Sequence, residues 1–303
     1  MSTRPICWQA WLTTTEPISM SMVITIKQAL SQAQRLQGVS EGWRLESEIL
    51  LAHVLNCERE TLFAWPAQEL SRQQADAYQN MMQRRERGEP IAYITGKKAF
   101  WDFELKVNPQ VLIPRPETEL LVETAINLLQ PKCSAALRLA DLGTGSGAIA
   151  LALARHRKHW RITAVDISPQ ALALAAENAQ LLQVENIEFC ESSWCDGLDA
   201  RAYDLVAANP PYVAVGDRHL QQGDLRFEPS IALAAEASGL SHLQEIVKKC
   251  RKILKKEAWL LLEHGFDQKQ AVSNLLRDAG YLNISCAVDL AGVDRLTCAQ
   301  SPG

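Results

Sequence analysis

The glycine-rich turn Asp141-Leu142-Gly143-Thr144-Gly145-Ser146-Gly147 lies where an apolar run over residues 137–142 gives way to a helical pattern over 147–156. Alternate glycines let the backbone approach a ligand closely and adopt positive φ angles. The helix that follows points its first N–H groups toward this turn, where they can bind a negatively charged group. A strand, a glycine turn and a helix in this order predict the nucleotide-binding end of a Rossmann-like α/β sheet.

Strand and helix patterns alternate along the chain on both sides of that turn. We expect strands at 137–142, 162–167, 187–190, 203–208, 258–263, 284–288 and 295–298. We expect helices at 117–129, 147–156, 169–182, 240–254 and 267–279. This alternation predicts an α/β domain with a doubly wound, parallel, seven-stranded sheet that is covered on both faces.

The chain before residue 117 divides into three further parts. Residues 22–96 have helical periodicity, with a capping box at Ser71 and Gln74, and we expect a small helical domain there. Phe103, Leu105 and Val107 alternate, Asn108-Pro109-Gln110 can turn and an apolar run follows, so residues 97–116 are expected to form a β-hairpin linker. Residues 1–21 have no period, and we expect a non-native or disordered extension, with translation starting at Met20 or Met22.

Composition limits the class of protein. The 303 residues are 47% hydrophobic and 22% charged, which argues against global disorder, and the net charge of −4 argues against a nucleic-acid binder. Eight cysteines form no C-x-x-C pair and the six histidines have no ligand spacing, so we expect reduced thiols, no metal site and a cytoplasmic location. No apolar run approaches the roughly 18 residues of a membrane span.

A second motif, Asn209-Pro210-Pro211-Tyr212, follows the apolar run Leu205-Val206-Ala207-Ala208. The nitrogen of a planar amide or ring-amino group is a poor nucleophile, because its lone pair is delocalised. Acceptors that hold its N–H groups can aim it at an electrophilic carbon. The Asn209 side-chain oxygen and the Pro210 carbonyl are suitable acceptors, and Tyr212 offers a ring face. Taken alone, the motif could also be a proline-rich turn that closes a strand.

The cofactor class follows from the two motifs together. Asp166 ends the second expected strand, where a carboxylate can accept both hydroxyls of a ribose. Asp166 could instead cap the next helix, although Ser168 fits that role better. The third glycine of a dinucleotide-binding turn would fall at Ala148. These features fit both nicotinamide and S-adenosylmethionine. The Asn-Pro-Pro-Tyr motif favours methyl transfer, since hydride transfer has no use for paired acceptors.

Over residues 24–298 the chain resembles the N5-glutamine methyltransferases that modify peptide chain release factors. The resemblance is carried by Gly88-Glu89-Pro90-Ile91-Ala92-Tyr93-Ile94-Thr95-Gly96, Phe100-Trp101, Leu112-Ile113-Pro114-Arg115-Pro116-Glu117-Thr118-Glu119, both motifs above and Arg226-Phe227-Glu228-Pro229. The Pro-Arg-Pro-Glu-Thr-Glu segment is the narrowest discriminator. The sister enzymes that methylate a ribosomal-protein glutamine typically have Ser-Pro after that arginine.

This resemblance implies a class I S-adenosylmethionine-dependent methyltransferase that acts, as a monomer, on the Gly-Gly-Gln loop of class-1 release factors, with no direct nucleic-acid or membrane partner. It implies catalytic roles for Asn209, Pro210 and Tyr212. It implies cofactor contacts from Gly143, Thr144, Gly145, Ser146, Gly147, Asp166, Trp194 and Asn209. It implies substrate contacts from Asn209, Pro210, Pro211, Tyr212, Phe100 and Arg115. Ser193 stands where this family often has an acidic residue near the adenine amino group.

Other readings stay open. A ribosomal-protein glutamine methyltransferase shares most of these features, and a DNA or RNA amino-methyltransferase would use the same turn on a flipped base. A nicotinamide oxidoreductase and a non-catalytic binding module are further alternatives. For Arg226 and Glu228 we expect an ion pair that ties down the loop after the active site.

Overall fold

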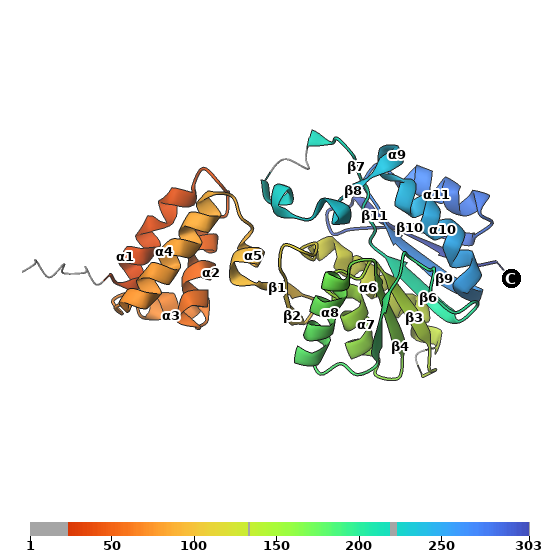
Figure 1. Ribbon diagram of the computed structural model, residues 1–303, viewed down its shortest axis with the longest axis horizontal. Helices are drawn as coiled ribbons and strands as arrows, with labels where there is room; N and C mark the ends of the chain where they lie inside the picture. The colour runs from red at the N-terminus through yellow and green to blue at the C-terminus, as the bar shows by residue number, and fades with distance from the viewer. Residues whose placement is uncertain (1–23, 133, 219–222, 303) are drawn as a thin grey trace, which may run out of the picture. The chain divides into compact units, whose positions relative to one another are not determined.

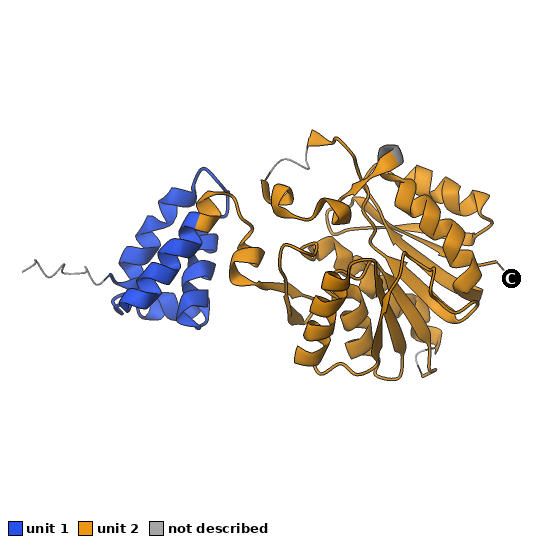
Figure 2. Ribbon diagram, in the orientation of Figure 1, with its two compact units in different colours: residues 1–83 blue, residues 84–303 orange. Residues whose placement is uncertain are grey.

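The computed structural model describes residues 24–132, 134–218 and 223–302 (Figure 1). The expected extension over residues 1–21, and the start site at Met20 or Met22, lie outside the described residues. Two compact units divide between Gln83 and Arg84, and Figure 2 distinguishes them by colour. No helix of the described residues is long and apolar enough to cross a membrane.

The first unit consists of helices. They are α1 (Ile26–Ser31), the 3-10 helix η1 (Gln32–Leu36), α2 (Trp43–Leu55), α3 (Arg59–Ala64) and α4 (Arg72–Glu86), whose last residues belong to the second unit. Ser71 and Gln74 form the expected capping box, with the Gln74 N–H donating to Ser71 Oγ and the Ser71 N–H to Gln74 Oε1. Tyr78 is fully buried, and its hydroxyl lies 2.6 Å from that of Ser47.

The hairpin is shorter and earlier than expected. After α5 (Ile91–Thr95), β1 (Lys97–Phe100) pairs antiparallel with β2 (Phe103–Lys106), and Phe100 stands opposite Phe103. The expected turn at Asn108-Pro109-Gln110 does form, because Asn108 Oδ1 accepts from the Gln110 N–H. The apolar run after it is not a strand, since the Ile113 N–H donates to the Glu228 side chain rather than to a neighbouring strand.

The second unit continues with η2 (Pro116–Thr118), α6 (Glu119–Leu129), η3 (Gln130–Lys132), β3 (Arg138–Leu142), α7 (Ala148–His156), β4 (Arg161–Asp166), α8 (Pro169–Leu181), β5 (Ile187–Glu191) and β6 (Tyr203–Ala208). It then contains β7 (Val213–Ala214), η5 (Gly223–Phe227), η6 (Ser230–Ala232), β8 (Ala234–Ala235), α9 (Glu236–Gly239), α10 (Ser241–Ile253), β9 (Leu254–Glu263), α11 (Lys269–Asp278), β10 (Leu282–Val288) and β11 (Asp294–Gln300).

The central sheet has seven strands in the order β10-β11-β9-β6-β3-β4-β5. Five of them are parallel, but β11 runs antiparallel to both β9 and β10, so the sheet is mixed rather than parallel as expected. The cause is the short loop between β10 and β11, in which the Asp289 N–H donates to the Val293 carbonyl. A connection of this length can join only antiparallel neighbours.

Alternate residues of the central strand β6 supply the two faces of the sheet. Leu205 and Ala207 pack into the layer of α6 and α7, whereas Val206 and Ala208 pack into the layer of α10 and α11. Both faces of the sheet are therefore buried at β6, and the second half of this central strand is wholly apolar, as a doubly covered strand requires. Polar groups are left for the strand ends, where the candidate site lies.

Candidate active site

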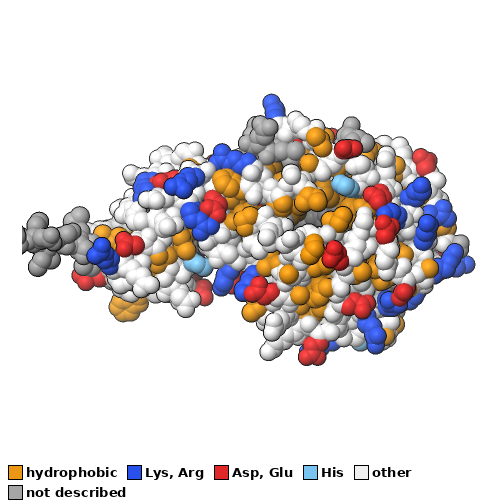
Figure 3. All heavy atoms as spheres, in the orientation of Figure 1, with side chains coloured by type: hydrophobic (Ala, Val, Ile, Leu, Met, Phe, Trp, Pro, Cys, Tyr) orange, Lys and Arg blue, Asp and Glu red, His pale blue; other side chains and the backbone are white. Residues whose placement is uncertain are grey.

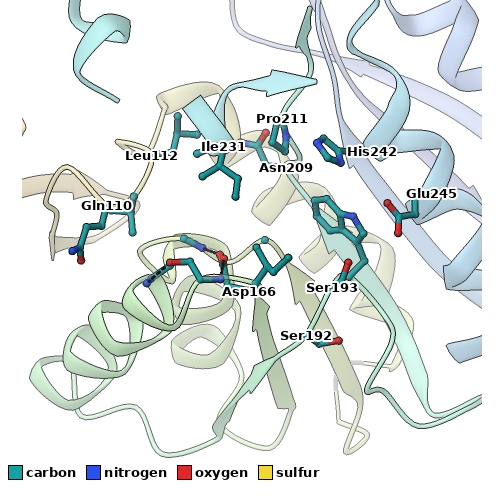
Figure 4. Close-up of a pocket in the computed structure, with 18 residues that line it drawn as sticks. Gln110, Leu112, Asp166, Ser192, Ser193, Asn209, Pro211, Ile231, His242 and Glu245 are labelled. Atoms are coloured by element: carbon teal, nitrogen blue, oxygen red, sulfur yellow. Dashed lines mark hydrogen bonds between the residues drawn. The ribbon is translucent and has the colours of Figure 1, made fainter. Parts of the chain in front are cut away.

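A pocket of about 240 Å³ opens at the carboxyl ends of the parallel strands (Figure 4). The strand order reverses between β3 and β6, which is the switch point at which open α/β sheets bind their ligands. The pocket lining combines four strand ends, the linker, η6 and α10. It consists of Gln110, Val111, Leu112, Gly143, Gly145, Asp166, Ile167, Ser168, Ala171, Ser192, Ser193, Trp194, Asn209, Pro211, Ile231, Ala232, His242 and Glu245.

The glycine turn has the backbone that its sequence predicts. Gly143, Gly145 and Gly147 have φ angles of 74°, 55° and 88°, which side-chain-bearing residues rarely adopt. A Cβ on Gly147 would lie 2.9 Å from Leu151 Cδ1 and 3.2 Å from Ala175 Cβ. The turn therefore packs tightly against the helices behind it, while Gly143 and Gly145 line the pocket.

Asp141 stabilises the glycine turn through two hydrogen bonds. Its Oδ2 accepts from the Thr144 hydroxyl at 2.7 Å and from the Ala150 N–H at 3.2 Å. Complete burial raises the pKa of Asp141 to about 7, against the two hydrogen bonds, which lower it. Thr144 and Ser146 are buried, and neither they nor Gly147 is among the described residues that line the pocket. These three residues hold the shape of the turn.

Asp166 lies on the pocket wall, and its carboxylate is already hydrogen-bonded to the backbone. Oδ2 accepts from the Gly145 N–H and Oδ1 from the Ser168 N–H, both at 2.9 Å (Figure 4). Each carboxylate oxygen keeps a second lone pair for a ligand hydroxyl. The cap of α8 is Ser168, whose hydroxyl accepts from the Ala171 N–H. The expectation that Ser168 fits the capping role better than Asp166 is confirmed.

The opposite wall is aromatic and polar. Trp194 has a φ of 54°, and its ring lies 3.4 Å from the place of a Cβ on Gly143. The His242 ring from α10 lies 5.4 Å from the Trp194 ring, centroid to centroid, at a tilt of 56°. Ser193 and Glu245 complete this wall (Figure 4). It can hold a flat ring beside polar groups.

Asn209 reaches the pocket directly after β6. Its Nδ2 donates to Thr118 Oγ1 at 3.1 Å, which leaves the side-chain oxygen without a donor among the described residues. Pro211 also lines the pocket, whereas Pro210 and Tyr212 do not. Instead, the Tyr212 carbonyl accepts from Gln268 Nε2 at 3.0 Å, and this contact holds the end of the motif.

Glu263, at the end of β9, lies behind this motif. It is 2% exposed, and its Oε1 accepts from the Tyr212 hydroxyl at 3.4 Å. Burial raises the pKa of Glu263 to about 7, while the hydroxyls of Thr118 and Tyr212 lower it. Burial also raises the pKa of Tyr212 above its ordinary value. Neither group contacts the pocket, so their effect on it must pass through other residues.

Phe100 and Arg115 do not line the pocket. Phe100 is 1% exposed and packs in the core beside Phe103. Arg115 forms an ion pair with Glu228, whose other oxygen accepts from the Ile113 N–H at 3.1 Å. The expected pairing of Arg226 with Glu228 is wrong.

Arg226 lies on the same loop as Glu228 but contacts other residues. Its guanidinium donates to the Arg87 carbonyl at 2.7 Å and lies over the Phe227 ring. Arg115, from the linker, occupies the position beside Glu228 that was expected for Arg226. The correction arises because contacts between distant segments override the short sequence separation of Arg226 and Glu228.

Several lining residues were not identified from the sequence. Gln110 and Leu112 come from an irregular segment, Ile231 from the short 3-10 helix η6, and His242 and Glu245 from one turn of α10. The helix was expected, but nothing in its pattern indicates that its first turn faces a ligand. Within the described ranges there is no group of three or more His, Cys, Asp or Glu residues that could hold a metal ion.

Comparisons with known proteins agree with this geometry. Residues 28–96 match the PrmC N-terminal domain family, and residues 117–226 match the methyltransferase small domain family. The release factor glutamine methyltransferase of Coxiella burnetii is 46% identical over 279 residues, which cover 92% of this chain and 99% of the relative. That of Shewanella oneidensis is 44% identical over 279 residues, covering 92% of this chain and 96% of the relative.

The fold has a solved counterpart as well. The structure of a methyltransferase from Pyrococcus furiosus aligns with a TM-score of 0.50 at 13% identity, covering 74% of this chain and 99% of that one. At this identity the likeness concerns the fold alone.

Proposed function

The chain belongs to the release factor glutamine methyltransferase family, and from this membership we propose that it methylates the side-chain amide nitrogen of a release-factor glutamine. The methyl donor is S-adenosylmethionine, and the target is the glutamine of the Gly-Gly-Gln loop of class-1 release factors. The observation that carries the proposal is Asn209, which lies on the pocket wall with its amide nitrogen bound to Thr118 and its oxygen left to accept.

The pocket residues fit S-adenosylmethionine. A Cβ added at Gly145 would meet nothing within 4 Å, so the backbone there borders open space that a ligand can fill. Asp166 offers free lone pairs for ribose hydroxyls, and the Trp194 ring can flank an adenine. When bound, the cofactor supplies an electrophilic methyl group on a sulfonium.

The residues of the protein then contribute to the reaction by orienting the substrate amide. Asn209 Oδ1 accepts one N–H of the glutamine amide, which directs its nitrogen toward the methyl group. The second acceptor expected from the sequence, the Pro210 carbonyl, belongs to a buried residue that does not line the pocket, so its role is proposed as indirect. Orientation of this kind is worth several orders of magnitude in rate. The substrate roles of Phe100 and Arg115 are proposed as indirect, since Phe100 lies in the core and Arg115 is paired with Glu228.

A protein loop is the substrate that best matches the mouth of the pocket. Ile167 and Ile231 line the pocket and are 58% and 64% exposed, and hydrophobic side chains gather on this face of the second unit (Figure 3). Such a rim suits a peptide better than a phosphate backbone, which needs basic groups. We also infer that the protein works as a monomer in the cytoplasm, where translation supplies its substrate.

The test is methyl transfer from labelled S-adenosylmethionine to three candidate acceptors: a class-1 release factor, ribosomal proteins and DNA. We expect label on the release factor and none when its Gly-Gly-Gln glutamine is changed to alanine. Label on a ribosomal protein would favour the sister activity instead. Label on DNA would favour an amino-methyltransferase that acts on a flipped base.

A further inference from the structure

The first turns of α10 bring a carboxylate to the pocket. The helix packs on the sheet and leads directly into β9, which is parallel to β6, so it begins at the sheet edge where the parallel strands end. Its apolar residues face the sheet and are buried, and they are Leu243, Ile246, Val247, Cys250 and Ile253. His242 and Glu245 are three positions apart, which places them on one side of the helix, and both line the pocket.

An ion-pair network holds Glu245 in place. Lys249, one turn further along α10, contacts Glu245 Oε1 and Asp196 Oδ2, both at 2.7 Å. Asp196 lies two residues after Trp194, so the network joins the helix to the segment that carries the aromatic wall. An ionised carboxylate has about four lone-pair sites, so the ion pair at Oε1 leaves acceptor capacity for a ligand N–H.

The carboxylates of the pocket match the two ends of an adenosine. Among the described residues that line the pocket, Asp166 and Glu245 are the two with carboxylates, and they lie on opposite walls (Figure 4). The donors of an adenosine are also at opposite ends, with the ribose hydroxyls at one and the 6-amino group of adenine at the other. With the hydroxyls at Asp166 and the base beside Trp194, the amino group meets the wall formed by α10.

We propose that Glu245 is a specificity-determining residue for the cofactor, and that its carboxylate accepts an N–H of the adenine 6-amino group. The inference deepens the proposed function and rests on it, since it takes the ligand to be S-adenosylmethionine. A base without the amino group leaves the carboxylate without its hydrogen bond in the filled pocket, and this loss weakens binding. The same residue therefore selects adenine over purines that lack this donor.

The test measures binding in the absence of release factor, with two nucleosides as probes. One is S-adenosylhomocysteine, and the other is its analogue in which hydrogen replaces the 6-amino group. Isothermal titration should show that the wild-type protein binds the adenine form about tenfold more tightly, as expected for a hydrogen bond to a charged acceptor. In Glu245→Ala the two probes should bind within about twofold of each other. An unchanged preference in Glu245→Ala, or no preference in the wild-type protein, would overturn the proposal.

Two further variants separate a direct contact from support of the helix. Glu245→Gln keeps a side-chain oxygen that can accept, so it should retain a preference of roughly threefold or more. Asp196→Ala is the matched control, because Asp196 contacts Lys249 but does not line the pocket. This control should keep the full preference for the adenine form. A preference lost equally in Asp196→Ala and Glu245→Ala would overturn the direct contact.

The outcomes also distinguish this inference from the proposed function. A protein that methylates the release factor, but whose preference does not depend on Glu245, refutes the inference alone. A protein that shows the preference that depends on Glu245, but leaves the release factor unmethylated, refutes the proposed acceptor alone. A protein that binds neither nucleoside refutes the proposed cofactor and the inference together.

Discussion

At the scale of single residues, the proposed chemistry depends on where hydrogen-bond acceptors point. Asn209 sits between the pocket and Thr118, and its amide is the only group of the Asn-Pro-Pro-Tyr motif that contacts both. Pro211 lines the pocket beside it, and Tyr212 turns away to reach Glu263. The motif is therefore divided: Asn209 and Pro211 face the pocket, and its last residue anchors the turn.

For Asn209→Ala we expect turnover to fall by about 10²-fold or more, because the glutamine nitrogen loses the acceptor that orients it. The affinity for S-adenosylmethionine should change much less, since the glycine turn, Asp166 and Trp194 remain. Isothermal titration of the cofactor and single-turnover rates measure the two quantities separately. Lost cofactor binding together with a near-normal rate would refute this role.

The sequence could predict the ligand-facing residues that belong to strand ends, and for a physical reason. Gly143, Asp166 and Asn209 each follow an apolar run, and parallel strands end at one edge of the sheet. Glu263 also ends a strand, yet it was missed because a single buried carboxylate has no spacing signature. Its position follows only from the register of β6 and β9.

At the scale of elements, apolar periodicity located every strand of the central sheet and the main helices of the second unit. The errors have local causes. Helix α3 has six residues, too few for a period to show. Strand β9 begins at Leu254, four residues before the expected 258, because Lys255, Lys256 and Glu257 hide its start. The hairpin was displaced because polar β1 contains two lysines and lacks the apolar alternation of a strand.

Gly147 tests the packing of the glycine turn. We expect Gly147→Ala to destabilise the protein by roughly 1 kcal/mol or more, because φ is 88° and the new Cβ would lie 3.2 Å from Ala175 Cβ. Gly38→Ala is the control, since a Cβ there meets nothing within 4 Å. Thermal unfolding of both variants gives the comparison. Equal midpoints would show that the turn tolerates a side chain.

The ion pair between Arg115 and Glu228 tests how the linker is held to the loop after β7. Glu228 has no exposed side-chain surface, so Arg115→Ala leaves a buried charge without its partner, at a cost of about 3 kcal/mol. Burial already raises the pKa of Glu228, and loss of Arg115 raises it further. The destabilisation should thus be larger at pH 8 than at pH 5, where Glu228 takes up a proton more readily.

Thermal unfolding at both pH values measures this effect. Adding Glu228→Gln to Arg115→Ala removes the buried charge, and the double variant should recover part of the loss at pH 8. A deficit that is the same at pH 5 and pH 8, with no recovery, would mean that the pair contributes packing rather than charge.

At the scale of the whole molecule, two buried carboxyls make the second unit sensitive to pH. Burial raises the pKa values of Asp141 and Glu263 to about 7, from their ordinary values of 3.8 and 4.5. A raised pKa in the folded state gives a contribution to stability that is complete below the unfolded pKa and is lost as the pH rises through the folded one. The free energy of unfolding should therefore decline between about pH 4 and pH 7 through these two groups.

Asp141→Asn tests this linkage directly. The variant keeps an acceptor for Thr144 and Ala150 but cannot ionise. Relative to the wild-type protein it should gain stability at pH 8, on the order of a few kcal/mol, and gain much less at pH 5. Unfolding midpoints without cofactor at the two pH values check this. A stability difference that does not grow with pH would mean that Asp141 is not forced to ionise in the folded protein.

Tandem mass spectrometry shows whether the pocket holds one glutamine amide of a release factor for methylation. A class-1 release factor is incubated with S-adenosylmethionine and either the wild-type protein or Asn209→Ala, then digested and sequenced. We expect one added methyl group on the side-chain nitrogen of the Gly-Gly-Gln glutamine, strongly reduced with Asn209→Ala. A methyl group on any other residue, or an unmodified loop beside a cofactor-loaded enzyme, would contradict it.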